Sequence, residues 1–336
     1  MIGGEKVNSI ISWVGGKKAL RNLIYERMPK SYGRYIEVFG GGGWVLFGKR
    51  VDKRVMEVYN DFNSNLANMF YCVKHSPCEF IRHLGFLPLN SRDEFNEIKD
   101  FINKKEFTKE HLQDELELAE RYLSDLEYAE LKPLLIENAE RTDVRRAVNY
   151  FKLIRYSYGS GTTSFGCNPF DIRKTFYLIW EASRRLSNTV IENKDFEALI
   201  RQYDRVDAFF YCDPPYFTSE YVYTCGFTLE DHIRLRDSLA SASGKWLVSY
   251  NDCEEIRKLY IGYEIFDFKR LHNMVQKYEA GKEFPELLIG NYDLYERVKA
   301  NPRQLTLFDY LEGYPKDNNT TLKESIISSR VKSKRN

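Results

Sequence analysis

Residues Ala208–Phe217 read AFFYCDPPYF, and this stretch decides the fold class. The continuous apolar run Ala208–Cys212 predicts a strand that is buried on both faces, as in a parallel sheet covered by helices. The strand has to end at the next segment, Asp213–Tyr216, because its two prolines have no N–H groups to give to a sheet. The pattern therefore predicts a stiff loop at the carboxyl end of a strand, where open α/β sheets bind ligands.

The predicted loop carries groups that suit an exocyclic amine. The carboxylate of Asp213 and the carbonyl of Pro214 can each accept an N–H bond from the N6 amine of adenine, which localises the nitrogen lone pair. Pro215 stiffens the loop, and the ring of Tyr216 can stack on a base that has left the duplex. The four residues taken alone equally fit a proline-rich turn after a core strand, with Asp213 in solvent.

The composition predicts a globular protein of a reducing cytoplasm. The chain has 336 residues, 43% hydrophobic and 15% aromatic, enough for one large domain with an insertion or for two smaller ones. It has no apolar run that could span a bilayer and no signal-peptide core at its N-terminus. Six scattered cysteines without a C-x-x-C pair argue against zinc and a disulfide framework, and we expect no metal. The net charge is +1, with basic ends and an acidic segment at 106–143; a surface for phosphates and an ordinary solvated face both fit this distribution.

Two glycine-rich segments predict a cavity near the N-terminus. Gly15 and Gly16 precede a helix expected from Lys17 to about Arg27, with Trp13 as a wall and Lys17 within reach of a carboxylate or phosphate. A loop before an amphipathic helix explains the same residues.

The second segment, Gly40–Gly43, lies between a strand predicted over 34–39 and a helix predicted over Trp44–Lys49. This order is typical of nucleotide-binding sites, because glycines let a ligand approach the backbone at a helix N-terminus. A P-loop is excluded, since Arg50 replaces the required Ser or Thr, and a Rossmann fingerprint is incomplete because Val45 stands at its last glycine. A plain structural glycine loop remains open.

Acidic residues follow two further predicted strands. Asp61 follows the second strand about 20 residues after the glycine loop, which favours a hydrogen bond to ribose hydroxyls. Asp195 and Phe196 follow a strand over Val190–Asn193 and can contact the edge and face of an adenine ring. Helix capping by Asp61, Asn63 or Asp195 explains the same positions, and nothing excludes both roles.

The middle of the chain predicts a helical insertion. Helices are expected over Ser91–Phe101, Lys109–Leu123, Asp125–Asn138 and Arg145–Tyr158, the last being basic and aromatic and leading into a glycine loop at 159–166. Side chains suited to phosphates and base edges are Arg155, Tyr156, Tyr158, Thr162, Thr163 and Ser164. A buried helix followed by a mobile loop is the alternative.

The remaining elements alternate between helices and strands, which indicates a doubly wound α/β domain. Predicted helices are Thr175–Leu186, Leu229–Ser241 and Asp252–Leu259, and predicted strands are Trp246–Tyr250, Glu264–Phe268 and Glu286–Asn291. Ser219–Gly226 is expected to be a mobile lid. In the polar tail, 297–336, the apolar residues of Gln304–Phe308 either dock on a partner or pack back on the domain.

Together, the motifs resemble those of Dam-type (D12 class) DNA adenine-N6 methyltransferases in the alpha-type order. They are Trp13–Lys17, Glu37–Gly42, Asn60–Asp61, Asn193–Phe196, Asp213–Tyr216 and Glu286–Asn291. The resemblance runs from about residue 8 to 293. It implies a Rossmann-like, S-adenosylmethionine-dependent catalytic domain over 1–73 and 187–296, with a mainly helical target-recognition domain inserted at 74–186 and a partly disordered basic tail over 297–336.

The resemblance also implies roles for individual residues. Asp213, Pro214, Pro215 and Tyr216 would bind and polarise the target amine for direct, in-line methyl transfer, with no covalent enzyme intermediate and no metal. S-adenosylmethionine would contact Trp13, Gly15, Lys17, Phe39, Gly40, Gly42, Asp61, Asp195, Phe196 and Asp213. Val38 departs from the proline usual in the family, and the insertion is too different for any recognition sequence to be carried over.

The resemblance finally implies partners. We expect double-stranded DNA as substrate, base flipping, a restriction-modification setting and a nucleoid-associated place in a bacterial or phage-infected cytoplasm. Gln304–Phe308 also resembles the motif that binds the replication sliding clamp. The alternatives are a catalytically inactive DNA-binding or regulatory protein on the same fold, a cytosine-N4 methyltransferase, whose loop usually begins with serine, and an RNA adenine methyltransferase.

Overall fold

A computed structural model describes residues 7–86, 89, 91–103, 110–141, 143–167, 170–217, 226–271 and 283–300. Two predicted features fall outside these ranges. Of the predicted lid over Ser219–Gly226, only Gly226 is described, and Gln304–Phe308 lies wholly outside, so its docking on a sliding clamp stays a prediction. None of the helices in the described ranges is long and apolar enough to cross a membrane.

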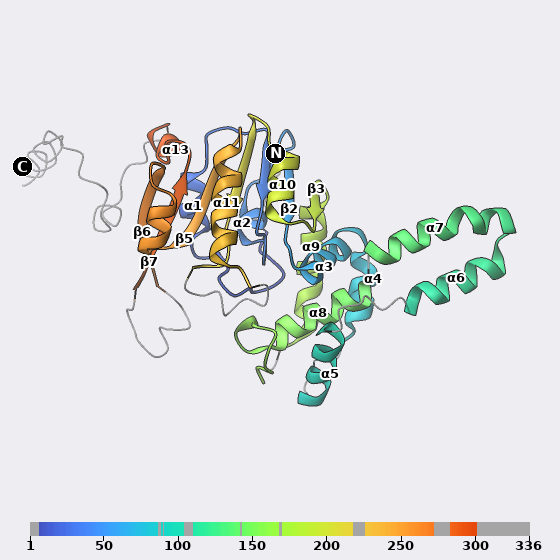
Figure 1. Cartoon of the computed structure of the whole chain (residues 1–336). Helices are drawn as coiled ribbons and strands as arrows, with labels where there is room; N and C mark the ends of the chain where they lie inside the picture. Colours follow the sequence, from blue (N-terminus) through green and yellow to red (C-terminus); the bar gives the residue numbers. More distant parts are fainter. Residues whose placement is uncertain are drawn as a thin grey trace, which may run out of the picture.

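One sheet forms the centre of the molecule (Figure 1). Its strand order is β3-β2-β1-β4-β5-β7-β6. Strands β1 to β5 are parallel, whereas β7 runs antiparallel to both β5 and β6. The bounds are β1 Arg34–Glu37, β2 Met56–Asn60, β3 Thr189–Glu192, β4 Ala208–Cys212, β5 Lys245–Asn251, β6 Glu264–Leu271 and β7 Glu283–Gly290. The order of the parallel strands confirms the predicted Rossmann-like α/β fold.

Helices cover both faces of the sheet (Figure 1) because side chains of successive strand residues point to opposite sides. In β4, Phe209 and Tyr211 pack in one core, and Phe210 and Cys212 pack in the other. The first core continues into α1, α2, α3, α8 and α9; the second lies under α10, α11 and α12. Burial on both faces is the reason for the uninterrupted apolar run of β4.

The helices lie close to the predicted ranges, with differences at their ends. The bounds are α1 Arg21–Arg27, α2 Trp44–Gly48, α3 Ser64–His75, α4 Pro77–Leu84, α5 Arg92–Asn103, α6 Glu110–Tyr122, α7 Asp125–Arg141, α8 Val144–Tyr156, α9 Phe176–Leu186, α10 Phe196–Tyr203, α11 Leu229–Ser241, α12 Glu254–Leu259 and α13 Glu296–Ala300, with short 3-10 turns at Tyr158–Ser160 and Ile172–Thr175. The sequence analysis missed α4. It also began α1 too early, because Lys17–Leu20 forms a turn in which the Leu20 amide donates to the Lys17 carbonyl.

Residues 74–186 are mainly helical, and part of them shares a core with the sheet. Side chains of α8 and α9 belong to the same apolar cluster as Tyr59 and Phe209 of the sheet. Helices α6 and α7 instead pack on each other and extend away from the sheet (Figure 1). The limits 74–186, and a target-recognition role for this segment, stay predictions.

The connections of β1 place the candidate site. β1 pairs with β2 on one side and with β4 on the other. The chain runs from β1 outward through β2 and β3, then returns to the other side of β1 at β4, so the strand order reverses between β1 and β4. The Val38 amide donates to the Tyr211 carbonyl at 2.9 Å, which keeps the carboxyl ends of these two strands together. The glycine loop and the Asp213 loop therefore leave the sheet side by side, at the switch point where doubly wound sheets bind ligands.

Candidate active site

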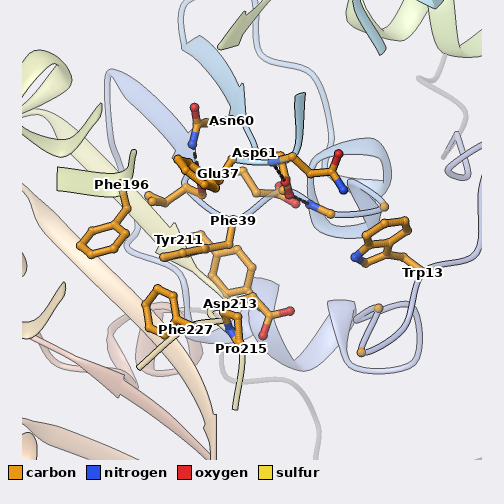
Figure 2. Close-up of a pocket in the computed structure, with 18 of the residues that line it drawn as sticks. Trp13, Glu37, Phe39, Asn60, Asp61, Phe196, Tyr211, Asp213, Pro215 and Phe227 are labelled. Carbon is orange, nitrogen blue, oxygen red and sulfur yellow. Dashed lines mark hydrogen bonds between the residues drawn. The ribbon is translucent and has the colours of Figure 1, made fainter. Parts of the chain in front are cut away.

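A cavity of about 700 Å³ opens at the carboxyl ends of β1 and β4 (Figure 2). It brings together residues that are far apart in the sequence. Those predicted to contact the methyl donor all line it: Trp13, Gly15, Lys17, Phe39, Gly40, Gly42, Asp61, Asp195, Phe196 and Asp213. Pro215 also lines the cavity, whereas Pro214, which is buried, and Tyr216, which is half-buried, are not among its lining residues.

The glycine loop lines the cavity with its backbone, at positions where a side chain would collide with neighbouring rings. A Cβ on Gly40 would lie 2.2 Å from the ring of Tyr59. Gly41 has φ +49°, in the left-handed region, and a Cβ there would lie 2.8 Å from Trp13. The Tyr59 hydroxyl donates to the Gly41 carbonyl at 2.8 Å, and this hydrogen bond ties the loop to β2. The backbone is thereby exposed to a ligand.

Asp61 binds the glycine loop, and the neighbouring Asn63 caps a helix. The Asp61 carboxylate accepts hydrogen bonds from the Gly41 amide at 2.7 Å and the Asn63 amide at 2.8 Å. Burial raises the pKa of Asp61 to about 6, although these two amides act in the opposite direction. The Asn63 side chain accepts from the amides of Asn65 and Leu66 at the start of α3. Asn63 is therefore the residue that caps α3, and Asp61 lines the cavity.

Glu37 is a buried acid that the sequence analysis did not select. It is 2% exposed, lines the cavity at the end of β1, and accepts a hydrogen bond from the Tyr35 hydroxyl at 2.7 Å. Burial raises its pKa to about 8, and the nearby Asp213 carboxylate adds to the rise. Burial thus favours the neutral form of the Glu37 carboxyl in the folded protein.

Contacts to Asp213 converge on one of its oxygens. The Lys17 ammonium lies 2.6 Å from Oδ1, and the Ser249 hydroxyl donates to the same atom at 2.7 Å. Lys17 is 3% exposed and also donates to the Gly15 carbonyl at 3.1 Å. Ser249 is in turn 3.4 Å from the Tyr211 hydroxyl. The carboxylate is thereby held by β5 and by the N-terminal glycine segment, and among the described residues no side chain binds Oδ2.

Tyr216 is anchored by residues of the antiparallel strands. Its hydroxyl donates to the Glu286 carboxylate at 3.0 Å, and Glu286 is paired with Arg270 of β6. The Lys17 ammonium lies 4.8 Å from the centre of the Tyr216 ring. Burial raises the pKa of Glu286. Glu286, Arg270 and Ser249 were not predicted as site residues, because each is a single polar side chain in a strand pattern.

An aromatic cluster forms one end of the cavity (Figure 2). The rings of Phe39, Phe196 and Phe227 lie at 5.7 Å from one another, centre to centre. Figure 2 shows them on the side of the cavity away from Trp13. Asp195 accepts from the Glu197 amide at the start of α10, so it is a helix cap that also lines the cavity. Phe227 is a further wall residue that the sequence analysis missed.

The residues predicted to bind DNA are only partly exposed. Tyr158 is 54% exposed, Thr163 and Ser164 are exposed and Thr162 is half-buried, all in the loop that follows α8. Tyr156 is 2% exposed and its hydroxyl donates to the Phe170 carbonyl, so its assignment to a DNA surface was wrong.

Arg155, the remaining member of this set, faces inward. Its guanidinium donates to the Ile10 carbonyl, and burial lowers its pKa to about 10. The chain turns at Ser157, which bridges to Phe165, and this turn directs the end of α8 into the core. Of the residues predicted to contact DNA, those of the loop after α8 are thus the more exposed ones, and their contact with DNA stays a prediction.

Comparison with known proteins agrees with this geometry. The family described as D12 class N6 adenine-specific DNA methyltransferase matches residues 13–274. The chain belongs to this family. The match confirms the resemblance and the activity predicted from the ordered motifs: adenine-specific methylation of DNA.

Curated relatives are similar along nearly their whole length. The chain is 26% identical to "Type II methyltransferase M1.LlaDCHI" of Lactococcus lactis subsp. cremoris, over 83% of this chain and 94% of the relative. It is 29% identical to "Type II methyltransferase M.MjaIII" of Methanocaldococcus jannaschii, over 85% and 100%. It is 24% identical to "Type II methyltransferase M.CviBI" of Paramecium bursaria Chlorella virus NC1A, over 84% and 99%. These relatives favour site-specific DNA methylation over the alternative functions.

Proposed function

We propose that this D12-class enzyme transfers a methyl group from S-adenosylmethionine to N6 of an adenine flipped out of double-stranded DNA. The observation that carries the proposal is the arrangement around Asp213. Its Oδ1 binds Lys17 and Ser249, and its Oδ2 is left for an amine at the edge of a cavity large enough for a nucleoside-containing donor.

The walls of the cavity fit S-adenosylmethionine, which supplies a methyl group on a positively charged sulfur. The cradle at Gly40 and Gly41 accommodates the donor against bare backbone, since a Cβ at either position would collide with Tyr59 or Trp13. Asp61 offers carboxylate oxygens beside this loop for ribose hydroxyls. The donor would thus be held along the edge of β1 and β2.

The aromatic end of the same cavity suits a nucleobase. Phe39 and Phe196 offer apolar ring faces, and Asp195 offers an acceptor for the exocyclic amine of the donor's adenine. Charge and hydrogen-bonding groups are thus distributed as the donor requires them, with acceptors for its hydroxyl and amine groups and apolar rings for its base.

In the transfer itself, Asp213 orients the target amine. A hydrogen bond from N6 to Oδ2, and a second to the carbonyl of Pro214, would localise the nitrogen lone pair toward the methyl group. Ser249 and Lys17 fix the carboxylate, so its orientation is set before substrate arrives. Pre-organisation of this kind lowers the cost of reaching the reactive geometry.

Tyr216 would stack on the flipped base. The ring is half-buried and its hydroxyl is bound by Glu286, so the orientation of the ring is set before a base arrives. Stacking on an aromatic ring offsets part of the cost of unstacking, which is a few kcal/mol. Tyr158, Thr163 and Ser164 of the loop after α8 are the side chains that would contact the DNA.

Methyl transfer by an Asp213→Asn variant tests this assignment. Asn keeps the size of the side chain but replaces one carboxylate oxygen by an NH2 group that cannot accept a hydrogen bond from N6. We expect methylation of duplex DNA with labelled S-adenosylmethionine to fall by at least about 100-fold. Asp237→Asn, on the exposed side of α11, is the matched control and should keep wild-type activity.

Nucleoside analysis of the product tests the base. N6-methyladenine is expected in duplex DNA treated with the wild-type protein. Detection of N4-methylcytosine, methylation of RNA alone, or full activity of Asp213→Asn would each overturn the proposal.

A further inference from the structure

We propose that Arg234 is a positioning residue that sets the nucleobase selectivity of the donor site, by holding Asp195 so that the cavity accepts a 6-amino purine and rejects a 6-oxo purine. This inference rests on the proposed use of S-adenosylmethionine. Arg234 lies in α11, lines the aromatic end of the cavity and is 38% exposed at its side chain. No sequence pattern singled it out, since it looks like a polar residue of an amphipathic helix.

The Arg234 guanidinium binds both oxygens of Asp195. One terminal nitrogen is 3.2 Å from Oδ1 and the other is 3.0 Å from Oδ2. A planar guanidinium that contacts both oxygens fixes the plane of a carboxylate as well as its position. Asp195 is also tied to the backbone by its hydrogen bond from the Glu197 amide at 3.0 Å. These contacts leave the carboxylate one orientation toward the cavity.

Arg234 is itself held on several sides. Its guanidinium carbon lies 4.3 Å from the centre of the Phe196 ring, within the range of a cation–π contact. The same group is 3.0 Å from Asp231 and 3.4 Å from Glu197. Asp231 is fixed in turn by the capping box with Thr228 at the start of α11. The cation is therefore positioned by two helices before any ligand binds.

The arrangement predicts selectivity for an amine. A carboxylate only accepts hydrogen bonds, so an oriented Asp195 pairs with the 6-amino group of adenine and opposes the 6-carbonyl of hypoxanthine. Among the described residues, Arg234 is the cation that pairs with Asp195, Asp231 and Glu197, so its removal would leave the three acids side by side without it. Repulsion among the three acids would turn Asp195 away from its orientation, and the distinction between amine and carbonyl would be lost.

Binding of two donor-product analogues tests the proposal. S-adenosylhomocysteine carries the 6-amino group, and S-inosylhomocysteine carries a 6-carbonyl in its place. Isothermal titration of the full-length wild-type protein is expected to show a preference for the amino compound of roughly 10- to 100-fold, as for a hydrogen bond to a charged group. In Arg234→Ala this preference should fall to within about threefold, chiefly through weaker binding of the amino compound.

Three further variants separate positioning from general damage. Arg234→Lys keeps a charge without the planar fork and should give an intermediate preference. Arg236→Ala, on the same helix but paired with Asp237, should keep the wild-type preference. In an Asp195→Asn background, the additional change Arg234→Ala should have little further effect on the ratio, because the two residues act through one contact.

The outcomes distinguish the inference from the proposed function. If the wild-type protein binds neither analogue, the proposed donor is wrong. If the wild-type protein prefers the amino compound and Arg234→Ala keeps that preference, Arg234 does not set selectivity and the inference is overturned. Tighter binding of both analogues to Arg234→Ala would equally overturn it, because Arg234 would then be an obstacle at the site.

Discussion

Replacing Glu37 by Gln tests the electrostatics beneath the glycine loop, because the change removes a titrating carboxyl and keeps an acceptor for the Tyr35 hydroxyl. Burial raises the pKa of Glu37 from its ordinary 4.5 to about 8. Between these values the folded protein holds a proton on Glu37 that the unfolded chain has lost. The stability contributed by the neutral carboxyl is therefore full below pH 4.5 and is lost as the pH rises through 8.

The size of the effect follows from the two pKa values. Their difference corresponds to about 5 kcal/mol over the whole titration, at about 1.4 kcal/mol for each tenfold change in the binding constant of the proton. Integration between about pH 5 and about pH 8 gives a loss of stability of about 3 to 4 kcal/mol over a pH range in which unfolding can be measured. Asp61 and other acids also titrate, so the informative quantity is the difference between wild type and Glu37→Gln.

Urea denaturation of both proteins, without donor or DNA, measures this difference. The wild-type free energy of unfolding should fall by about 3 to 4 kcal/mol relative to the variant between about pH 5 and about pH 8. Glu264→Gln, at the exposed start of β6, is the control and should follow the wild-type curve. If the curves of wild type and Glu37→Gln run parallel over this range, the carboxyl does not titrate there and the reasoning is wrong.

Two further substitutions test the loops around the cavity. Ser249→Ala removes the hydroxyl that donates to Asp213 and should lower the single-turnover rate about 10-fold with an unchanged donor dissociation constant; an unchanged rate would show that the contact does not orient the acid. Gly40→Ala places a methyl group against the buried Tyr59 ring and should destabilise the fold by about 1–3 kcal/mol in thermal or urea unfolding. Gly161→Ala, which meets its nearest neighbour at 3.6 Å, is the control, and equal stability of the two variants would contradict the predicted collision.

The walls of the cavity could be predicted because each follows a strand directly. Gly40, Asp61, Asp195 and Asp213 stand at the ends of apolar segments, and parallel strands bring such positions to one edge of a sheet. Proline and glycine act on the backbone locally, so their patterns can be interpreted without knowing how the chain packs. The sequence therefore sufficed for the fold class and for most of the residues that line the cavity.

The residues behind the cavity could not be predicted, because they depend on register between distant strands. Ser249 meets Asp213 across 36 residues, and Glu286 meets Tyr216 across 70. Each looks in the sequence like one polar residue in a strand, and only the pairing of β5 with β4 and β7 gives it a partner.

The end of α8 shows the same limit at short range. Tyr156 lies on a basic, aromatic helix that suits nucleic acids, but its hydroxyl bonds to the Phe170 carbonyl. The helix ends at Tyr156, two residues before the predicted end at Tyr158, and the chain turns at Ser157. Which side chains of such a helix are exposed is decided by where the chain turns, and helix ends are the least certain part of a sequence-based prediction.

The charges around the Asp213 loop bear on how the buried acid Glu37 and the proposed cationic donor would share one site. Asp213 and Glu286 are balanced by Lys17 and Arg270, so a neutral Glu37 leaves this group without net charge. A donor with a positively charged sulfur adds one charge to a cavity that Glu37 lines. A positive charge nearby favours the ionised form of a carboxyl, so we expect the proposed donor to lower the pKa of Glu37. Donor binding and loss of the Glu37 proton should then be coupled, so binding of the proposed donor is expected to strengthen as the pH rises toward 8.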